Sequence, residues 1–488
     1  MMRRLYLLAV LAGCGSAPPV VNDLGPDDLS TDTMDLAPDL AAQKICNVRA
    51  YGAVGDGVTK DTVAIQAAIA DCTGGIVRLE NGIFLSGMIV LSSHVTLEIT
   101  GSATLLGSQD IADYPDRNPP IQNTQLASCK KSLIYAESAD DIHLQGTGTI
   151  DGNAAPLWIG LQIKEGLRPM AIFTVSSTNV TITDLTVRKA GVWAVVNMEV
   201  KHLHISGLHV DNDFGVTHDG IDVVDGQDVL IENCTIASGD DSICLKSGST
   251  NGLVDVTVRN CHTTTSGVAN GVKFGTASVG PFKNITVENV LIENASAAAL
   301  SVESVDGSAI SNIIFRHITI RNAGTPIFVL LGSRNRDVTQ VGSIDGVSFD
   351  DIHALGPANA WGSVVTGTVI GTQTFGISNL SFSNLDLVEK GAGATPNPAP
   401  FTIDTFPEYQ GPVPGQPGKF YNQYPDVKFI AGTDGNADTT YYAPGYAFFV
   451  RHASGITFNA CTTPLAGTDI RPALASKDVT GLVGGCTP

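Results

Sequence analysis

A short alternation of apolar and polar positions recurs along most of the chain. The repeated unit reads apolar, polar, apolar, polar, a turn-type residue and then apolar, as in 180–185 (VTITDL) and 285–290 (ITVENV). The turn-type position falls at residues 184, 207, 233, 260, 289, 317, 351 and 384, in steps of 23, 26, 27, 29, 28, 34 and 33 residues. Because alternation at period two places one face of a strand in the core, each unit predicts a half-buried strand.

Repetition at a period of 20–50 residues is the sequence signature of a stacked architecture. A coil of about 25 residues with three short strands is the unit of a right-handed parallel β-helix. The Asn, Asp or Gly after each strand supplies the turn into the next strand, so we interpret the recurring Asn residues as turn residues and not as ligands. A leucine-rich horseshoe would need regular Leu positions, and a propeller blade would need about 40–50 residues. The pattern therefore predicts an all-β fold, a single-domain right-handed parallel β-helix.

The segment 61–71 departs from this pattern and has helical spacing. Apolar groups from Val63 to Ala70 fall on one side, and Asp61 or Thr62 can cap the start. An open coil would expose strand edges at the end of a solenoid. We therefore expect one amphipathic helix that covers the N-terminal end of the β-helix.

The first 13 residues have the pattern of an export signal, with a basic start followed by the apolar run 5–11. Residues 11–14 (LAGC) resemble the bacterial lipobox, whose cysteine is lipidated after cleavage. We expect Cys14 to anchor the protein at the bacterial cell envelope without spanning a membrane. Secretion after an ordinary signal peptide is the alternative.

Residues 14–43 follow as a Pro- and Asp-rich stretch without Lys, Arg or aromatic residues. Such a stretch buries too little surface to fold, and its charges favour an extended chain. We interpret it as a tether and residues 44–488 as the folded domain. Its six Asp residues account for part of the net charge of −20.

Composition narrows the class of protein further. The chain has 16% charged residues, 52 Gly and 43% hydrophobic residues, which suits many short strands and tight turns. The acidic balance argues against a nucleic-acid partner. After the N-terminal signal, the sequence has no apolar run of about 20 residues that could span a membrane. Eight cysteines remain besides Cys14, and export makes disulfides plausible, but the sequence does not choose among the pairings or exclude buried thiols.

The densest acidic cluster is 217–222 (THDGID), followed by 238–242 (SGDDS). Asp219 and Asp240 are 21 residues apart, close to one coil, so we expect Asp219 to lie beside Asp240 and Asp241 on adjacent coils. Without Lys or Arg next to them, three carboxylates raise one another's proton affinity. Glycosidic cleavage requires one protonated and one ionised carboxyl group. A solvated turn or a calcium site is the alternative.

These motifs resemble family 28 of the glycoside hydrolases, the polygalacturonase and rhamnogalacturonase family. The opening 51–57 (YGAVGDG), the aspartate motif 219–222 (DGID) and the paired aspartates in 239–241 (GDD) match that family's pattern. The resemblance runs from about residue 45 to the C-terminus. It implies hydrolysis with inversion of configuration, with Asp240 as the general acid and Asp219 and Asp241 holding and deprotonating the attacking water.

Three positions depart from the family's pattern. Asn270 stands where the family's Gly-His-Gly motif has His, 301–303 (SVE) replaces its Arg-Ile-Lys motif, and 217–218 (TH) replaces Asn-Thr. The three carboxylates are kept while the groups that read galacturonate differ. A rhamnogalacturonan or another acidic or neutral glycan is therefore the expected substrate, ahead of that of a typical endo-polygalacturonase.

Other polar and aromatic residues near these motifs are candidates for substrate binding. Each also has an ordinary structural interpretation, such as a surface lysine or loop packing. Lys246 and Lys273 could restore carboxylate recognition, and Trp158 could stack on a sugar ring from an insertion that walls the groove. The full candidate set is Asn270, Lys246, Lys273, His218, Glu303, Arg168 and Trp158.

The sequence thus predicts an exported, monomeric glycosidase that degrades a pectic polysaccharide, with no metal and no cofactor. Two other functions stay open. One is a polysaccharide lyase on the same scaffold, which needs a basic catalytic residue. The other is a non-catalytic, glycan-binding β-helix at the cell surface.

Overall fold

The computed structural model describes residues 43–159, 164–267, 269–334, 337–356, 362–396, 399–406 and 442–488. Residues Gln43–Pro488 form one compact unit. The predicted signal peptide, Cys14 and all of the predicted tether except Gln43 lie outside the described residues. No helix in the described part of the chain is long and apolar enough to cross a membrane.

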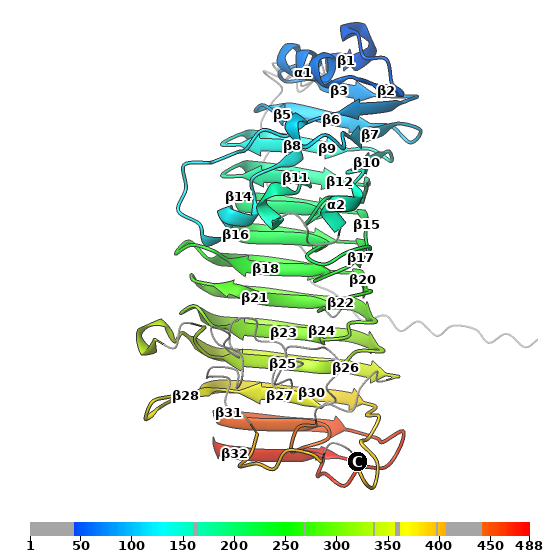
Figure 1. Ribbon diagram of the computed structural model, residues 1–488. Coiled ribbons are helices and arrows are strands. Elements are labelled where there is room, and N and C mark those ends of the chain that lie inside the picture. The colour runs from blue at the N-terminus through cyan, green and yellow to red at the C-terminus, as the bar shows by residue number, and fades with distance from the viewer. Residues whose placement is uncertain are drawn as a thin grey trace, which may run out of the picture. The chain divides into compact units, whose positions relative to one another are not determined.

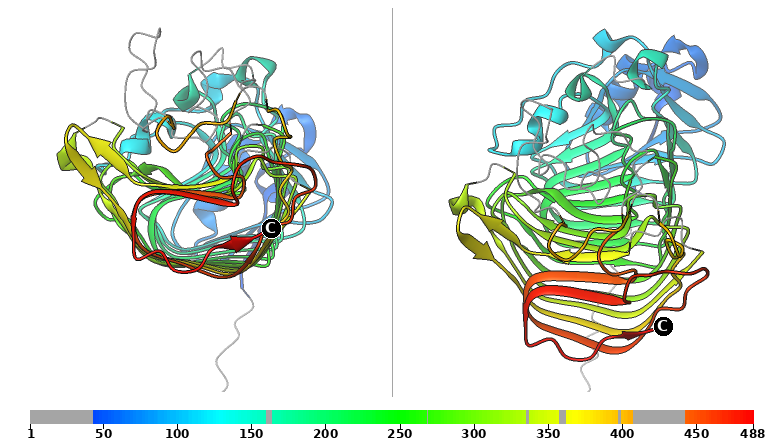
Figure 2. Two further views of the ribbon diagram at one scale, coloured as in Figure 1. Left: turned by 90° about the horizontal axis from the view of Figure 1, so that it is seen from below. Right: turned by 60° about the horizontal axis from the view of Figure 1, so that its bottom comes forward.

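Parallel strands from successive coils stack into three ladders (Figure 1), which surround one interior when seen end-on (Figure 2). Strands that run through a bend contribute to two ladders. The first ladder is β5 (Ile89–Leu91), β8 (Ser132–Glu137), β11 (Met170–Val175), β14 (Val195–Ser206), β16 (Ile221–Glu232), β18 (Ile243–Ser247), β21 (Val272–Ser278), β23 (Ala298–Ser304), β25 (Thr325–Leu331), β27 (Ser363–Thr366), β31 (Phe448–Thr462) and β32 (Leu474–Thr480).

The second ladder contains the recurring alternation found in the sequence. It is β1 (Ile45–Asn47), β3 (Ile76–Leu79), β6 (Val95–Ile99), β9 (Asp140–Gln145), β12 (Thr178–Thr183), the later parts of β14 and β16, β19 (Leu253–Arg259), β22 (Phe282–Glu293), β24 (Ala309–Arg321), β26 (Ser343–Leu355), β30 (Ile377–Leu387) and β31.

The third ladder closes each coil. It is β2 (Asp56–Lys60), β4 (Ile83–Ser86), β7 (Thr104–Gly107), β10 (Thr149–Asp151), β13 (Thr186–Arg188), β15 (His209–Asn212), β17 (Thr235–Ser238), β20 (His262–Thr265), the ends of β22, β24, β26, β30 and β31, and β33 (Cys486–Thr487). A small antiparallel pair, β28 (Thr368–Ile370) and β29 (Gln373–Phe375), lies outside the ladders.

The turn positions predicted from the repeat have left-handed backbone geometry. All eight have positive φ, from 53° at Asn289 to 65° at Gly207. Asn, Asp and Gly tolerate this region better than other residues, which explains why they recur there. Between the turns the inward positions form the core, in which Phe315, Phe349 and Phe382 stack with centroid distances of 4.9 and 5.1 Å.

Helices are few and short. α1 (Thr62–Asp71) covers the N-terminal end of the coils, as predicted (Figure 1). Its details differ from the prediction, because Val63 is 83% exposed and Asp61 does not cap the helix with its side chain. The Asp61 carboxylate instead accepts hydrogen bonds from the backbone N–H groups of Val54 and Gly55. The remaining helical turns are η1 (Val48–Tyr51), η2 (Ile111–Asp113), η3 (Thr124–Ser128), α2 (Pro156–Ile159), η4 (Glu165–Leu167) and η5 (Val338–Gln340).

Two disulfides lie near the two ends of this unit. Cys46–Cys72 joins β1 to the end of α1, and Cys461–Cys486 joins β31 to β33. The four other described cysteines are buried thiols: Cys129, Cys234, Cys244 and Cys261.

Candidate active site

The acidic residues singled out in the sequence lie just before two neighbouring strands of the first ladder. Asp219 precedes β16, and Asp240 and Asp241 precede β18. Parallel backbone hydrogen bonds continue past the strands, with Gly220 N–H donating to the Asp241 carbonyl at 3.0 Å. This register has an offset of 22 residues and sets Asp219 beside Asp241, with Asp240 one position before it, so the two acidic motifs lie on adjacent coils as predicted.

The three aspartates share one open pocket of about 210 Å³. Its lining residues come from both sides of the aspartates along the stack of coils, and they are Gln125, Ser128, Glu165, Trp193, Thr217, Asp219, Asp240, Asp241, Lys246, Lys273, Thr276, Ala277 and Arg334. Of the predicted site residues, the structure therefore places Asp219, Asp240, Asp241, Lys246 and Lys273 together.

Asp241 lies among groups that stabilise its ionised form. Lys273 Nζ is 3.1 Å from its Oδ2, and Asn270 donates to its Oδ1 from the backbone N at 3.0 Å and from Nδ2 at 2.7 Å. Burial alone would raise the pKa of Asp241, but Lys273, Lys246 and the Asn270 hydrogen bond outweigh it and lower the pKa below its ordinary value. Asn270 thus contacts the carboxylate and does not itself line the pocket.

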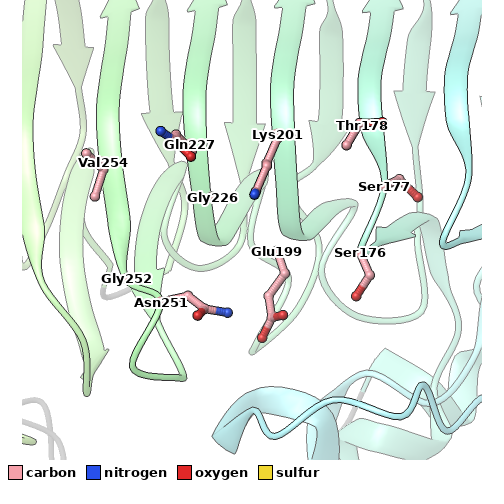
Figure 3. A pocket seen from close by; sticks show the side chains of 10 residues that line it. All are labelled: Ser176, Ser177, Thr178, Glu199, Lys201, Gly226, Gln227, Asn251, Gly252 and Val254. Atoms are coloured by element: carbon pink, nitrogen blue, oxygen red, sulfur yellow. The ribbon is translucent and has the colours of Figure 1, made fainter.

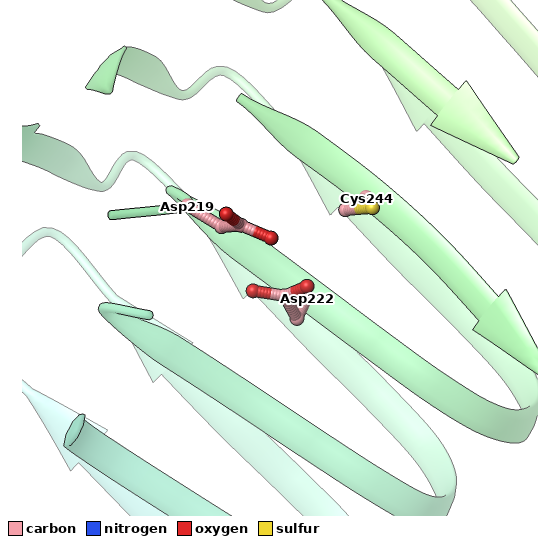
Figure 4. A group of neighbouring side chains, drawn as sticks. All are labelled: Asp219, Asp222 and Cys244. Carbon is pink, nitrogen blue, oxygen red and sulfur yellow. The ribbon is translucent and has the colours of Figure 1, made fainter. Parts of the chain in front are cut away.

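Asp219 belongs to a buried group with Asp222 and Lys246, and Figure 4 shows the two aspartates of this group. Lys246 Nζ donates to Asp219 Oδ2 at 3.0 Å and also to Asp222 Oδ1, and it lies 4.5 Å from the centre of the Trp193 ring. Burial raises the pKa of Asp219 well above normal against the opposing effect of Lys246. Burial likewise raises the pKa of Asp222, to about 6.

Asp240 has a different environment from Asp241. Its Oδ2 accepts a hydrogen bond from the Thr217 backbone N–H at 3.0 Å. Burial, and then the charges of Asp219 and Asp241, raise its pKa well above the usual range. The pKa values of these two neighbouring aspartates therefore differ in opposite directions from the ordinary value, so that Asp240 keeps a proton at pH values where Asp241 is ionised.

The presence of two lysines corrects one premise of the sequence argument. The carboxylates were expected to act on one another without Lys or Arg beside them, yet Lys246 and Lys273 are each in contact with one of them. The sequence does not show these contacts, because each lysine reaches its aspartate from the next coil. Lys246 on β18 contacts Asp219, and Lys273 on β21 contacts Asp241. Mutual repulsion still contributes, but ion pairing decides which carboxyl ionises first.

Besides Asn270, four predicted substrate-binding residues do not line the pocket. His218 is fully buried with its ring 4.5 Å from that of Phe214, and burial lowers its pKa to about 3. Glu303 is buried and accepts a hydrogen bond from Ser301 Oγ at 2.7 Å.

The insertion residues are also buried, which corrects the prediction that Trp158 stacks on a sugar. Trp158 is 2% exposed and packs edge-on against Tyr114. Arg168 is fully buried, and it donates to the Trp158 carbonyl at 2.9 Å and to Thr217 Oγ1. The backbone N–H of Thr217 donates to Asp240, so Arg168 helps to position this aspartate through Thr217.

Several residues of the site were missed from the sequence. Asp222 does not line the pocket but binds Lys246, and its place three residues after Asp219 in the acidic motif could have marked it. Trp193, Glu165 and Arg334 carry no local motif, because they reach the pocket from other coils and an insertion. Arg334 pairs with Asp306, donating from Nε to Oδ1 at 2.7 Å and also from Nη2 to Oδ2.

One group of side chains could be taken for a metal site. Ligand atoms of Asp219, Asp222 and Cys244 lie within 4.8 Å of one another (Figure 4). The Lys246 ammonium binds both carboxylates at this point. A cation would have to displace that charge, so the donor set does not fit a metal well.

Comparisons with known proteins agree on one family. The family model described as "Glycosyl hydrolases family 28" matches residues 78–395. A probable polygalacturonase of Vitis vinifera is 32% identical over 213 residues, covering 41% of this chain and 43% of the relative. Exopolygalacturonase X-1 of Emericella nidulans is 24% identical over 384 residues, covering 71% and 83%. The chain thus spans less than half the length of the first of these relatives.

Solved structures show the same architecture. The family 28 exopolygalacturonase of Yersinia enterocolitica aligns with a TM-score of 0.63 at 18% identity, covering 92% of this chain and 80% of that one. Polygalacturonase from Erwinia carotovora aligns with a TM-score of 0.58 at 19% identity, covering 71% and 93%. The predicted right-handed parallel β-helix is thereby confirmed.

Proposed function

The chain belongs to family 28 of the glycosyl hydrolases, and from this premise we propose that it hydrolyses glycosidic bonds of a pectic polysaccharide with inversion of configuration. The observation that carries the proposal is the opposite titration of two adjacent carboxyls. The pKa of Asp240 is raised and that of Asp241 is lowered, so one proton donor and one proton acceptor coexist in the same pocket.

In the proposed reaction Asp240 gives its proton to the leaving glycosidic oxygen as the bond to the anomeric carbon breaks. A water molecule attacks that carbon from the opposite face and loses its proton to a carboxylate, which gives inversion. Asp241 and Asp219 hold this water. The Lys273 and Asn270 contacts support Asp241 as the group that receives the proton.

Substrate recognition is proposed to use the cations that line the pocket. Lys246 and Lys273 are each paired with site aspartates, whereas Arg334 is paired with Asp306 at the side of the pocket that Thr276 and Ala277 also line. Arg offers five N–H donors in a planar fork that matches a carboxylate. We assign Arg334 to binding a uronate carboxylate, in place of the missing Arg-Ile-Lys motif.

The lyase alternative is disfavoured by the protonation state of the lysines. A lyase needs a basic group to take the proton next to the uronate carboxylate. Although burial opposes it, the surrounding acids raise the pKa of both Lys246 and Lys273 well above the ordinary value. Lysines held this firmly as ammonium ions are poor bases.

A direct assay tests the proposed activity. The purified chain is incubated with polygalacturonate, rhamnogalacturonan and xylogalacturonan, and reducing ends and ultraviolet absorbance of unsaturated uronate are read together. Reducing ends without absorbance support hydrolysis, and proton NMR of the first product reports inversion. Both signals together would identify a lyase, and no product from any glycan would refute the proposed function.

The Asp240→Asn variant supplies the matched control. We expect its kcat to fall by about 10²–10⁴-fold, since asparagine cannot donate the proton. Its thermal stability at neutral pH should equal or exceed that of the parent, because a partly buried carboxyl with a raised pKa is replaced by a neutral group of the same shape. Full activity in this variant would remove Asp240 from the mechanism.

We further propose that the protein is exported and anchored through a lipid on Cys14. The two disulfides support an oxidising compartment. Metabolic labelling with a radioactive fatty acid tests the anchor. Label in the parent that is lost in Cys14→Ser supports it, and an unlabelled parent refutes it.

A further inference from the structure

A second groove in the described part of the chain lies away from the aspartates. It has a volume of about 580 Å³ and is lined by Ser176, Ser177, Thr178, Glu199, Lys201, Gly226, Gln227, Asn251, Gly252 and Val254 (Figure 3). These residues sit where the chain bends from the first ladder into the second. Along β16 the bend at Gly226 is seven residues beyond Asp219, or about 23 Å in an extended strand.

The lining side chains form a row across four successive coils. Thr178 pairs with Lys201, Lys201 with Gln227, and Gln227 with Val254. Neighbouring strands are about 4.8 Å apart, so the row extends over about 14 Å. This rung spacing is comparable with the length of one pyranose residue, which suits a ligand chain laid along the stack.

Most of the long polar side chains of this groove are not used by the fold, although Ser177 bonds to the backbone of Ala139 and Val175 and Thr178 donates to Asp140. Among the described residues, the side chains of Glu199, Lys201, Gln227 and Asn251 make no hydrogen bond or ion pair. Ser176 Oγ also has no partner there, although it is inaccessible to solvent. The next turn row differs, because its side chains bond to one another from coil to coil.

The contrast between the two rows is specific. In the adjacent row His202 Nδ1 lies 2.8 Å from Asp228 Oδ2, and Asn284 Nδ2 donates to Asp255 Oδ1 at 2.8 Å. The side chains of that row hydrogen-bond to one another. Those of Glu199, Lys201, Gln227 and Asn251 in the groove have no such partner among the described residues and are left to bind a ligand.

The backbone at the groove is held in an uncommon conformation. Glu199 has φ of 53° and Ser176 has φ of 50°, and these residues occupy equivalent positions on adjacent coils. The left-handed region is unfavourable for a side chain as long as Glu. The same geometry recurs at the equivalent positions Ser138 and Asp225, so it belongs to the regular bend that shapes the groove.

The charges and groups of the groove define its ligand. Glu199 and Lys201 contribute one charge of each sign, so the lining is neutral overall, and the remaining groups are amides and hydroxyls. A neutral lining without an excess of cations does not favour a polyanionic stretch. Amides, hydroxyls and a carboxylate are suited to the hydroxyl groups of sugars.

We propose that this groove is a second glycan-binding site, which holds the hydroxyl groups of a weakly charged stretch of the polysaccharide while another stretch occupies the aspartate pocket. The identity of the glycan rests on the proposed function. A second contact raises the local concentration of polymer at the enzyme without adding to the chemistry of cleavage.

Affinity electrophoresis of the full chain in gels that contain methyl-esterified pectin tests this site. The Asp240→Asn background prevents digestion of the gel. We expect the Glu199→Ala/Gln227→Ala/Asn251→Ala variant to bind about tenfold more weakly, as three lost hydrogen-bonding side chains imply. Lys283→Ala/Ser311→Ala is the matched control, because these residues continue the same row outside the groove.

The Gln227→Ala/Asn251→Ala variant leaves the left-handed Glu199 backbone intact, and it should show weaker binding even if the triple variant folds poorly. With Asp240 present, both groove variants should cleave short oligosaccharides at the parent rate. If the parent hydrolyses pectin and the gel retards the double variant as much as the parent, the second site is refuted. A parent that no pectin gel retards would refute it as well. If the groove variants lose retention and the parent cleaves no glycan, the proposed hydrolysis is refuted and the second binding site stands.

Discussion

At the scale of single residues, the site depends on charges that the sequence keeps far apart. Asp240 and Asp241 are neighbours in the chain, yet one is surrounded by acids and the other by Lys273 and Asn270. The difference is created by β21 and the segment before it, about 30 residues further on. The acidic motif could therefore be predicted from the sequence, while the protonation state of each member could not.

Replacing Lys273 by Met tests this arrangement. Asp241 must be ionised to accept a proton, so activity is lost as pH falls through its pKa. Removing a cation 3.1 Å away raises that pKa, and the acid limb of the kcat/KM profile should move up by about one to three pH units. The exposed Lys283→Met serves as a control that should leave the limb in place. An unmoved acid limb in Lys273→Met would show that Lys273 does not tune the base.

Arg334 gives a second prediction at this scale, about specificity. If its guanidinium reads a uronate carboxylate, Arg334→Ala should raise KM for polygalacturonate about tenfold or more and leave KM for methyl-esterified pectin nearly unchanged. Arg334→Lys should recover part of the loss. The partly buried ion pair with Asp306 predicts some loss of stability as well, so the ratio of the two KM values is the informative measurement. An equal rise for both substrates would assign Arg334 a structural role.

At the scale of elements, the prediction succeeded where the residue type indicates the backbone conformation directly. The turn residues at 184, 207, 233 and onwards all have positive φ, because few other residues tolerate that region at so little cost. The α1 segment was predicted to within one residue of its bounds, but with errors in its contacts. Val63 faces solvent, and the Asp61 carboxylate binds the loop before β2, since tertiary contacts decide which face packs and which polar group is taken.

The disulfide between Cys46 and Cys72 fixes α1 on the first coil. Its two residues are 26 apart, and closing a loop of this size restricts the unfolded chain by about 3 kcal/mol. The Cys46→Ala/Cys72→Ala variant should therefore unfold at a lower denaturant concentration, with a free energy of unfolding that is lower by about 3 kcal/mol. Cys129→Ala, which removes a buried thiol that is not bonded, is the control for loss of a buried sulfur. Equal unfolding midpoints for parent and double variant would show that the bond does not stabilise this end.

At the scale of the whole molecule, the low charge and high glycine content follow from stacking. Coils with apolar interiors need little charge, and their bends need Gly, Asn and Asp. The stacking also places acidic residues in buried positions, including Asp219, Asp222, Asp225 and Glu389, and leaves Asp240 partly buried. Burial raises the pKa of each of these groups, so the titration of the folded chain differs from that of the unfolded chain.

This difference predicts that the protein is most stable at mildly acidic pH. An unfolded aspartate titrates near pH 4, whereas Asp222 and Asp225 titrate at about 6 in the fold. Between these values the folded state binds more protons, so stability falls as pH rises through that window. For one such group the loss is at most about 3 kcal/mol. The growing negative charge of the chain acts in the same direction.

Asp225 allows the effect to be isolated. Its carboxylate accepts hydrogen bonds from Asn123 Nδ2, Ser247 Oγ and the Gly248 backbone N–H, and it does not line the pocket. Asp225→Asn keeps a carbonyl acceptor and removes the titration, so the fall in melting temperature between pH 5 and pH 7.5 should be smaller than in the parent. Asp228→Asn, at an exposed carboxylate three residues along, should not change it. A parent that melts higher at pH 7.5 than at pH 5 would contradict the whole scheme, because buried carboxyls with raised pKa values can only weaken the fold as they ionise.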